Sequence, residues 1–316
     1  MKPTLARLAA ALALAAATAA HAAGPLQKTQ APGFYRTMLG DFEVTALSDG
    51  TVGLPVDQLL QRTTPDKVRK ALARQFLGVP TETSVNAYLV NTGSKLVLVD
   101  TGAAGLFGPT LGNLLASLQA AGYKPEQIDE VYITHMHGDH VGGLMTGDKP
   151  TFPNAVVRAD KREADFWLSA ENLEKAPKEA KDFFRGAQLS VNPYVKAGKF
   201  QPFDGSSDLV PGVKAVANHG HTPGHTVYLV ESKGQKLLLW GDMMHVAAVQ
   251  FANPRVTIQF DTDQQKAYEA RRKMFAEAAK GGWLVGGAHL SFPGLGRLRA
   301  EGAGYQFVPA AYSIPR

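Results

Sequence analysis

The sequence predicts a single domain of the α/β layered-sandwich class, and two observations lead to that expectation. Short apolar segments typical of strands alternate with amphipathic segments typical of helices, and strand pairs joined by tight turns are interspersed among them. The chain has 316 residues, of which 45% are hydrophobic, and a chain of this size can bury a sizeable core. Because no repeat or low-complexity linker divides it, we expect one folded domain over residues 23–316.

Residues 1–22 have the pattern of a secretory signal peptide. A positively charged start is followed by an apolar run over residues 8–20, and residues 20–22 read Ala-His-Ala, a small-x-small cleavage pattern. The run is too short for a membrane span, and no later segment approaches the usual 18 apolar residues. We therefore expect cleavage before Ala23 and a periplasmic or secreted protein, with a retained N-terminal anchor as the alternative.

Charge and cysteine content narrow the class further. The formal net charge is +5, and removal of Lys2 and Arg7 with the signal would leave a weak, unclustered +3, which predicts no nucleic-acid surface. The chain has no cysteine. Export would therefore bring no disulfide, and the available metal ligands are His, Asp and Glu.

The expected elements follow from periodicity and from turn residues. In the first half we expect a strand at 42–47 closed by a turn at 48–50, a helix at 65–76, strands at 85–91 and 95–99, a helix at 111–121 and a buried strand at 131–133. In the second half we expect a largely helical region at 161–190 interrupted near Pro177, strands at 213–217, 226–230 and 237–240, a helix at 262–280, and strands at 284–286 and 305–308.

The most informative motif follows the strand at 131–133, where residues 135–140 read H-x-H-x-D-H. Three imidazoles and a carboxylate that are crowded and partly desolvated are costly unless a cation binds them. His135 and His137 are two residues apart at the end of a strand and can converge on one ion. Asp139 and His140 open the next segment and can face a second ion. Zn²⁺ accepts both nitrogen and carboxylate ligands.

Three further signals are weak when taken singly. They are the His221 turn within H-G-H-T-P-G-H at 219–225, Asp242 after the strand at 237–240, and His289 after the strand at 284–286. A lone His or Asp at the end of a strand is more often a turn or capping residue. Their order after the H-x-H-x-D-H motif is what makes them informative.

Together the four signals resemble the metallo-β-lactamase superfamily over roughly residues 40–310. The resemblance implies a four-layer αββα sandwich with two divalent ions, most simply Zn²⁺, at the ends of the sheets. It implies that one ion is held by His135, His137 and His221 and the other by Asp139, His140 and His289, with Asp242 bridging the two. It further implies that Asp100 orients a ligand imidazole and that His225 supports the ligands.

The implied chemistry is hydrolysis. A water between two divalent ions is acidified toward neutral pH and becomes a nucleophile, and the ions polarise the carbonyl or phosphoryl oxygen. Asp139 could accept a proton or orient the hydroxide, so Asp139 and Asp242 are the expected catalytic residues. Neither a serine nucleophile elbow nor a phosphate-binding loop competes with this interpretation.

Within the superfamily, residues 100–110, 154–160 and 289–294 resemble the methyl parathion hydrolases. That likeness implies an exported homodimer whose pocket is walled by Phe107, Trp167 and Phe184. Other pocket positions depart from the phosphotriesterases, and these are Leu60, His245 and Phe260. Ile258 lies close by in sequence and is also expected in the pocket. We therefore expect aromatic lactones of the dihydrocoumarin type or aryl esters as substrates, with organophosphates as a side activity. Alternatives are an organophosphate triester hydrolase, a β-lactamase, and a non-catalytic metal-binding protein.

Overall fold

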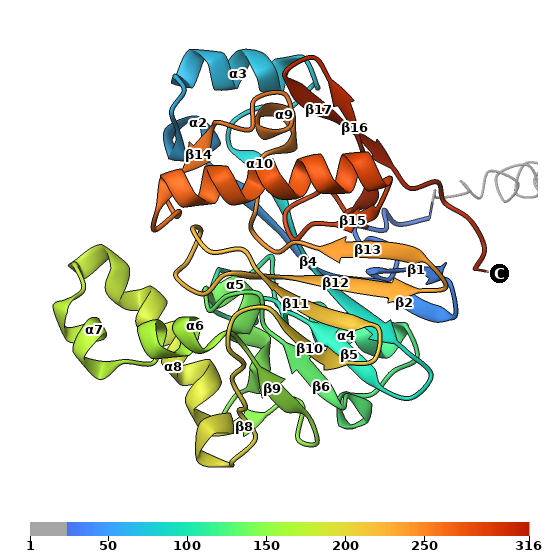
Figure 1. The fold of residues 1–316 in the computed structure, drawn as a ribbon, viewed down its shortest axis with the longest axis vertical. Helices are drawn as coiled ribbons and strands as arrows, with labels where there is room; N and C mark the ends of the chain where they lie inside the picture. The colour runs from blue at the N-terminus through green and yellow to red at the C-terminus, as the bar shows by residue number, and fades with distance from the viewer. Residues whose placement is uncertain (1–23, 316) are drawn as a thin grey trace, which may run out of the picture. The chain divides into compact units, whose positions relative to one another are not determined.

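Two β-sheets face each other in the folded unit that begins at Pro32, and helices cover the outer face of each sheet (Figure 1). The computed structural model describes residues 24–315, so the predicted signal at 1–22 lies outside the described residues. The expected layered α/β sandwich is confirmed. No helix among residues 24–315 is long and apolar enough to cross a membrane.

The first sheet has six strands in the order β1-β2-β4-β5-β6-β9. Their bounds are β1 Phe34–Leu39, β2 Phe42–Leu54, β4 Thr81–Asn91, β5 Leu96–Val99, β6 Glu130–Tyr132 and β9 Val156–Arg158. The first four strands pair antiparallel, whereas β5, β6 and β9 run parallel. Parallel strands place their carboxyl ends at one edge, and the H-x-H-x-D-H motif follows β6 at that edge.

The second sheet has seven strands in the order β10-β11-β12-β13-β15-β16-β17. Their bounds are β10 Ser207–Val210, β11 Val213–Ala217, β12 Thr226–Ser232, β13 Gln235–Leu239, β15 Leu284–Gly286, β16 Leu295–Glu301 and β17 Gly304–Pro309. Only β13 and β15 pair in parallel within this sheet, so the segments after them, which carry Asp242 and His289, leave the sheet at one edge. Because β12 is antiparallel to β13, the His221 turn enters at that same edge.

Helices and short strands complete the fold. The helices are α2 Val56–Leu59, α3 Pro65–Ala73, α4 Leu114–Ala120, α5 Gly138–Val141, α6 Lys161–Trp167, α7 Ala170–Lys175, α8 Lys181–Lys196, α9 Ala247–Gln250 and α10 Gln264–Gly281, with 3-10 turns at Pro125–Gln127, Gly142–Leu144 and Lys178–Ala180. Two small pairs join β3 Leu60–Gln61 to β14 Thr257–Ile258 and β7 Met145–Thr146 to β8 Lys149–Pro150.

Apolar side chains fill the space between the sheets and beneath the helices. Tyr132 of β6 and Tyr228 of β12 stack across the inner layer with ring centroids 5.4 Å apart. On the outer face of the second sheet, Trp240 packs on Phe275 of α10 at 5.4 Å. Full burial of a large apolar side chain stabilises the fold by about 1.5–3 kcal/mol. These layers hold the sheet edge that carries the His and Asp motifs in a fixed position.

The turn expected at residues 48–50 is absent, because β2 continues to Leu54 with a bulge between Ser48 and Gly50. Asp49 is buried at the bulge. Its carboxylate accepts hydrogen bonds from the backbone N–H groups of Ala103, Gly112 and Leu114. Asp49 of the Ser48-Asp49-Gly50 segment therefore anchors a distant loop, whereas the sequence pattern predicted that this segment forms a local turn.

Other differences concern boundaries. The helix expected at 111–121 begins at Leu114, after Gly112 takes φ +91°. The helical region expected to end at 190 continues to Lys196 despite Pro193 within its last turn. The strand β16 was not expected, because its sequence Leu-Gly-Arg-Leu-Arg-Ala-Glu contains a glycine and three charged residues and has no clear alternation.

Candidate metal centre

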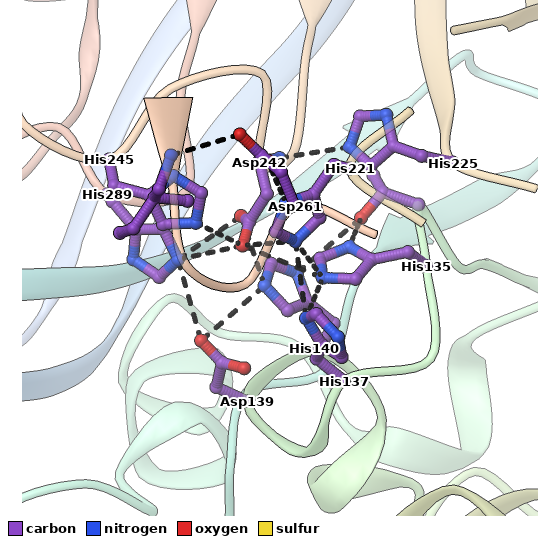
Figure 2. Close-up of polar contacts among 12 residues, drawn as sticks. His135, His137, Asp139, His140, His221, His225, Asp242, His245, Asp261 and His289 are labelled. Atoms are coloured by element: carbon purple, nitrogen blue, oxygen red, sulfur yellow. Dashed lines mark hydrogen bonds and ion pairs between the residues drawn. The ribbon is translucent and has the colours of Figure 1, made fainter. Parts of the chain in front are cut away.

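Three overlapping groups of metal-ligating side chains meet at the sheet edge, and two of them contain all the predicted ligands, while the third joins His245 to Asp242 and His289 (Figure 2). In the first group, Nε2 of His135 lies 3.0 Å from Nδ1 of His137, and Nε2 of His221 lies 3.2 Å from each of those two atoms. An ion bound tetrahedrally by nitrogens at 2.0–2.1 Å holds them about 3.3 Å apart. Three imidazole nitrogens therefore already have the mutual spacing of ligands to a single ion.

The second group contains Asp139, His140 and His289. Oδ2 of Asp139 lies 3.5 Å from Nε2 of His140 and 3.5 Å from Nε2 of His289. All three side chains project into the space that Asp242 borders from above in Figure 2. One carboxylate and two imidazoles form a mixed N and O donor set, which divalent metals such as zinc accept.

Asp242 lies between the two groups and contacts both, and its Oδ2 also lies 3.2 Å from Nε2 of His289. Its Oδ1 is 3.2 Å from Nε2 of His140 and 3.1 Å from Nε2 of His289. Its Oδ2 is 3.4 Å from Nε2 of His221 and 3.5 Å from Nε2 of His135. The structure thus brings together all seven side chains that the sequence predicts as ligands, and places the predicted bridge between them.

Two buried atoms of this centre show that the donor set suits cations. Nε2 of His140 and Oδ1 of Asp242 lie 3.2 Å apart without hydrogen-bond geometry, and among the described residues neither buried atom has a hydrogen-bond partner. A buried polar atom without a partner costs about 1–3 kcal/mol. A cation between the imidazole nitrogen and the carboxylate oxygen removes that cost for both atoms, so the residues present fit a metal.

The outer nitrogens of the ligand rings are held by hydrogen bonds, which fix each ring and its tautomer. Nδ1 of His140 donates to Oδ2 of Asp100 at 2.8 Å, and Nδ1 of His221 donates to Oδ1 of Asp261 at 2.8 Å. Nδ1 of His289 donates to the Ser84 carbonyl at 2.9 Å. In each case the remaining Nε2 lone pair is left to face the centre.

Asp100 and His225 lie where the sequence predicts supporting residues. Asp100 also accepts hydrogen bonds from the N–H and hydroxyl of Thr134, both at 2.8 Å, so it holds the segment that begins the ligand motif. His225 donates from Nδ1 to the Asn218 carbonyl and accepts the N–H of Asp242 at Nε2, at 3.2 and 3.1 Å. Both of its ring nitrogens are engaged, and it fixes the backbone of the shared carboxylate.

The electrostatics of the centre favour positive charge. Burial opposes ionisation of Asp242, but His140, His289 and the other surrounding histidines together outweigh it and hold the pKa of that carboxyl well below its usual range. Burial opposes charge on His221 as well, but Asp242 and Asp261 outweigh it and raise its pKa to about 9. Burial and neighbouring His140 lower the pKa of His135, which keeps that ring neutral. A metal binds ionised carboxylates and neutral imidazoles, so an ion bound here would take the place of the proton that Asp242 and Asp261 hold on His221.

The family model for the metallo-beta-lactamase superfamily matches residues 80–289, which contain every one of these donors. The chain belongs to the metallo-β-lactamase superfamily. The shared fold and the order of the motifs, read from the sequence, agree with this assignment.

Solved structures of superfamily members resemble this chain closely. Hydrolase AbOPH of the β-lactamase superfamily is 37% identical, with a TM-score of 0.85 over 90% of this chain and 100% of that one. AidC, described as a dizinc quorum-quenching lactonase in complex with the product N-hexanoyl-L-homoserine, is 28% identical, with a TM-score of 0.81 over 89% of this chain and 99% of that one.

Among curated proteins, an N-acyl homoserine lactonase of Bacillus cereus is 27% identical over 171 residues, which make up 48% of this chain and 60% of that protein. A second N-acyl homoserine lactonase, from a Bacillus species, is 29% identical over 165 residues, which make up 46% and 58%. The match therefore spans less than two thirds of the length of these lactonases.

A small apolar cavity of about 80 Å³ opens directly above the metallo-β-lactamase centre. Its polar side is formed by residues of the centre, and its apolar wall is formed by Val52, Leu54, Val85, Phe107, Leu111, Phe183 and Phe260, with His245 beside them. Of the pocket residues predicted from sequence, Phe107, His245 and Phe260 line this cavity. His245 also stacks on the His289 ring at 5.1 Å and contacts Oδ2 of Asp242 through Nε2 at 3.0 Å.

Four predicted pocket residues do not line the cavity. Leu60 and Ile258 pair across β3 and β14 and are buried in a satellite core that supports Phe260 from behind. Trp167 and Phe184 pack on each other at 4.6 Å within the core beneath α8. The ring of Trp167 still touches that of His137, at 5.3 Å, so it supports a ligand and leaves the cavity wall to Phe183.

Sequence reasoning missed three residues that the structure places at the centre. Asp261 contacts His221, Glu163 accepts hydrogen bonds from two ligand-bearing loops, and Phe183 lines the cavity. Asp261 lies close to Asp263, the N-cap of α10, and no pattern shows which of the two carboxylates turns inward. Glu163 lies in a charged stretch typical of an exposed helix. Phe183 and Phe184 are neighbours on α8, so the sequence does not show which of the two rings faces the cavity.

Proposed function

We propose that this protein is a metal-dependent hydrolase that opens lactones or aryl esters with two divalent ions, most simply Zn²⁺. The observation that carries the proposal is the position of Asp242, whose carboxylate contacts both donor groups at the floor of an apolar cavity. A purely structural metal site has no need of two adjoining groups that open onto a cavity. The family membership and the lactonases among the relatives support the same class of reaction.

When bound, the two ions supply an acidified water as nucleophile and polarise the substrate carbonyl. Residues of the chain orient this water and hold the ligand groups in place. Asp139 borders the cavity and has a depressed pKa, because His140 and His289 outweigh the effect of burial. It is therefore ionised and placed to orient the attacking water by accepting its hydrogen bond. Asp242 holds the two donor groups at a fixed spacing throughout the reaction.

The shape of the cavity favours a flat substrate. Phe107, Phe183 and Phe260 approach the centre from separate elements, and His245 closes the wall near Asp242. A planar bicyclic lactone of the dihydrocoumarin type, or a flat aryl ester, can enter between aromatic rings and place its carbonyl at the centre. A phosphotriester is tetrahedral before attack and must seat three substituents in the same space, so organophosphates are proposed as a side activity.

A second candidate substrate is a lactone that carries an apolar chain. A larger hollow of about 460 Å³ adjoins the cavity and shares Phe107 and Phe183 with it. Its other lining residues include Leu106, Gly186 and Leu189. A compact ring would leave this hollow empty, whereas an acyl chain would bury apolar surface there at about 25 cal/mol per Å². The N-acyl homoserine lactonases among the relatives make this second candidate worth testing directly.

A hydrolysis panel on zinc-loaded protein tests the proposal. It compares dihydrocoumarin, an aryl acetate, short- and long-chain N-acyl homoserine lactones, a methyl parathion-type triester and a β-lactam. The first proposal expects the highest kcat/KM for dihydrocoumarin or the aryl ester, and the second candidate expects it for the long-chain lactone. Turnover of the triester above all lactones and esters would favour a phosphotriesterase, and no turnover at all would favour a non-catalytic metal-binding protein.

Export and assembly complete the proposal. We propose that the protein is secreted or periplasmic and acts as a homodimer on a small-molecule substrate. Mass spectrometry of periplasmic protein should find the mature N-terminus near Ala23, and an intact Met1 would refute cleavage. Light scattering should give twice the mass of the processed chain, and a monomer mass would refute the dimer.

A further inference from the structure

One fully buried carboxylate, that of Glu163 on α6, contacts two of the loops that supply metal ligands. Its Oε1 accepts the backbone N–H of Met136 at 2.9 Å, and its Oε2 accepts the backbone N–H of Gly224 at 2.8 Å. Met136 lies between the ligands His135 and His137. Gly224 lies three residues after the ligand His221. The two oxygens of one side chain therefore join the loop after β6 to the loop before β12.

We propose that Glu163 is a positioning residue that sets the distance between these two loops and so assembles the first group of metal ligands. The proposal rests on the two-metal centre proposed above and assigns Glu163 no contact with substrate. A carboxylate suits this role because it has two acceptor oxygens, and because a charged acceptor forms hydrogen bonds roughly twice as strong as a neutral one.

The burial of Glu163 shows that the two contacts matter energetically. Its exposed fraction is 0%, and moving an isolated carboxylate out of water is costly unless hydrogen bonds compensate. Burial raises the pKa of Glu163, and the N–H groups of Met136 and Gly224 oppose that rise. Two backbone donors from separate loops thus compensate the buried acid.

Close packing supports the same conclusion. A Cβ atom at Gly224 would lie 2.4 Å from the backbone nitrogen of Glu163, so only glycine lets the loop approach α6 this closely. One helical turn after Glu163, the Trp167 ring packs edge-on against His137 with centroids 5.3 Å apart. Helix α6 therefore contacts the first ligand group in two ways. One is the pair of hydrogen bonds that Glu163 accepts from Met136 and Gly224, here called the brace, and the other is the Trp167 ring.

The second ligand group is anchored elsewhere. His140 is held by Asp100, and His289 is held by the Ser84 carbonyl. Among the described residues, none of the hydrogen bonds of Glu163 reaches His289 or its loop. Loss of the brace should therefore loosen one ion more than the other, a pattern that general destabilisation of the fold would not produce.

The test is Glu163→Gln, which keeps the size of the side chain but turns one acceptor into an NH2 group that faces a backbone donor. Stepwise Zn²⁺ dissociation is measured by competition with a chelating dye, and Co²⁺ absorption spectra are recorded on the same proteins. We expect one of the two equivalents to bind about 10–100-fold more weakly, the effect typical of outer partners of metal ligands. Glu163→Asp, which retains the charge but reaches less far, should show the same selective loss.

Glu130→Gln is the matched control. Glu130 is also buried, and it pairs with Arg158 at 2.8 Å and not with a ligand loop, so both equivalents should bind as in the parent. The weakened step is assigned by comparison with Asp261→Asn, since Asp261 contacts His221 of the first group. Unchanged binding in folded Glu163→Gln and Glu163→Asp, or equal weakening of both equivalents, would overturn the brace. Failure of the parent to bind two ions would instead contradict the proposed function.

Discussion

The metal centre and the cavity wall above it are built in different ways. In the second ligand group, a hydrogen bond from the outer ring nitrogen fixes each imidazole. His140 donates to Asp100, and His289 donates to the Ser84 carbonyl. The wall is made of apolar side chains from separate strands, loops and helices, and Phe107 is 37% exposed. Directional bonds fix the reaction chemistry, whereas apolar contacts set substrate choice and tolerate substitution. Changes in the centre should therefore abolish activity, and changes in the wall should redirect it.

The largest effect is expected for Asp242→Ala, which removes the carboxylate shared by both ligand groups. Both metal occupancies should fall, and kcat/KM should drop by more than about 100-fold, because loss of a direct ligand exceeds the loss of an outer partner. The change is measured by elemental analysis together with steady-state kinetics. Near-normal activity with two bound metals would show that Asp242 does not bridge the groups.

This contrast also explains which parts of the site the sequence could predict. His135, His137, Asp139 and His140 are close in sequence, so their spacing alone indicates a shared site. Asp261 lies 40 residues from the ring that it orients. A single inward-facing carboxylate leaves no local pattern, so the sequence offered no signal for Asp261.

The cavity wall could be predicted only in part for the same reason. Phe183 and Phe184 are adjacent, and which of them faces the cavity depends on the rotation of α8, which is set by packing across the whole helix. The fold class was predictable, because alternating strand and helix patterns are local. The bulge at Asp49 could not be predicted, because the carboxylate there accepts hydrogen bonds from backbone N–H groups more than 50 residues away.

An intermediate effect is expected for Asp261→Asn. The neutral amide oxygen of the variant accepts a weaker hydrogen bond from His221 than the carboxylate does. Affinity for one ion should therefore fall about 10–100-fold. Dye competition measures the change. Asp263→Asn is the matched control, because Asp263 caps α10 and has no contact with a ligand. If both variants bind metal as the parent does, the outer hydrogen bonds do not support the centre as described.

The smallest effect is expected in the wall and concerns substrate choice. His245→Leu combined with Phe260→Leu removes bulk beside Asp242 and should shift the ratio of kcat/KM toward methyl parathion-type triesters and away from aryl lactones by about tenfold, the effect of 1.4 kcal/mol in the transition state. The ratio is the informative quantity, because loss of His245 also removes a contact with Asp242.

Phe307→Leu serves as the control for this shift, since Phe307 packs on Phe251 outside the cavity. It should leave the ratio of the two activities unchanged. A parent enzyme that prefers triesters, or a double variant with no shift, would show that steric fit in this wall does not decide between planar and tetrahedral substrates.

The central claim is that two ions act together in one centre, and titration of metal-free protein with Zn²⁺ tests it most directly. Aryl lactone hydrolysis is followed while bound metal is counted by elemental analysis on the same samples. The structure predicts that activity rises to a plateau at two equivalents per chain, because Asp242 serves both ligand groups. A plateau at one equivalent, or full activity with no metal bound, would contradict the two-metal centre.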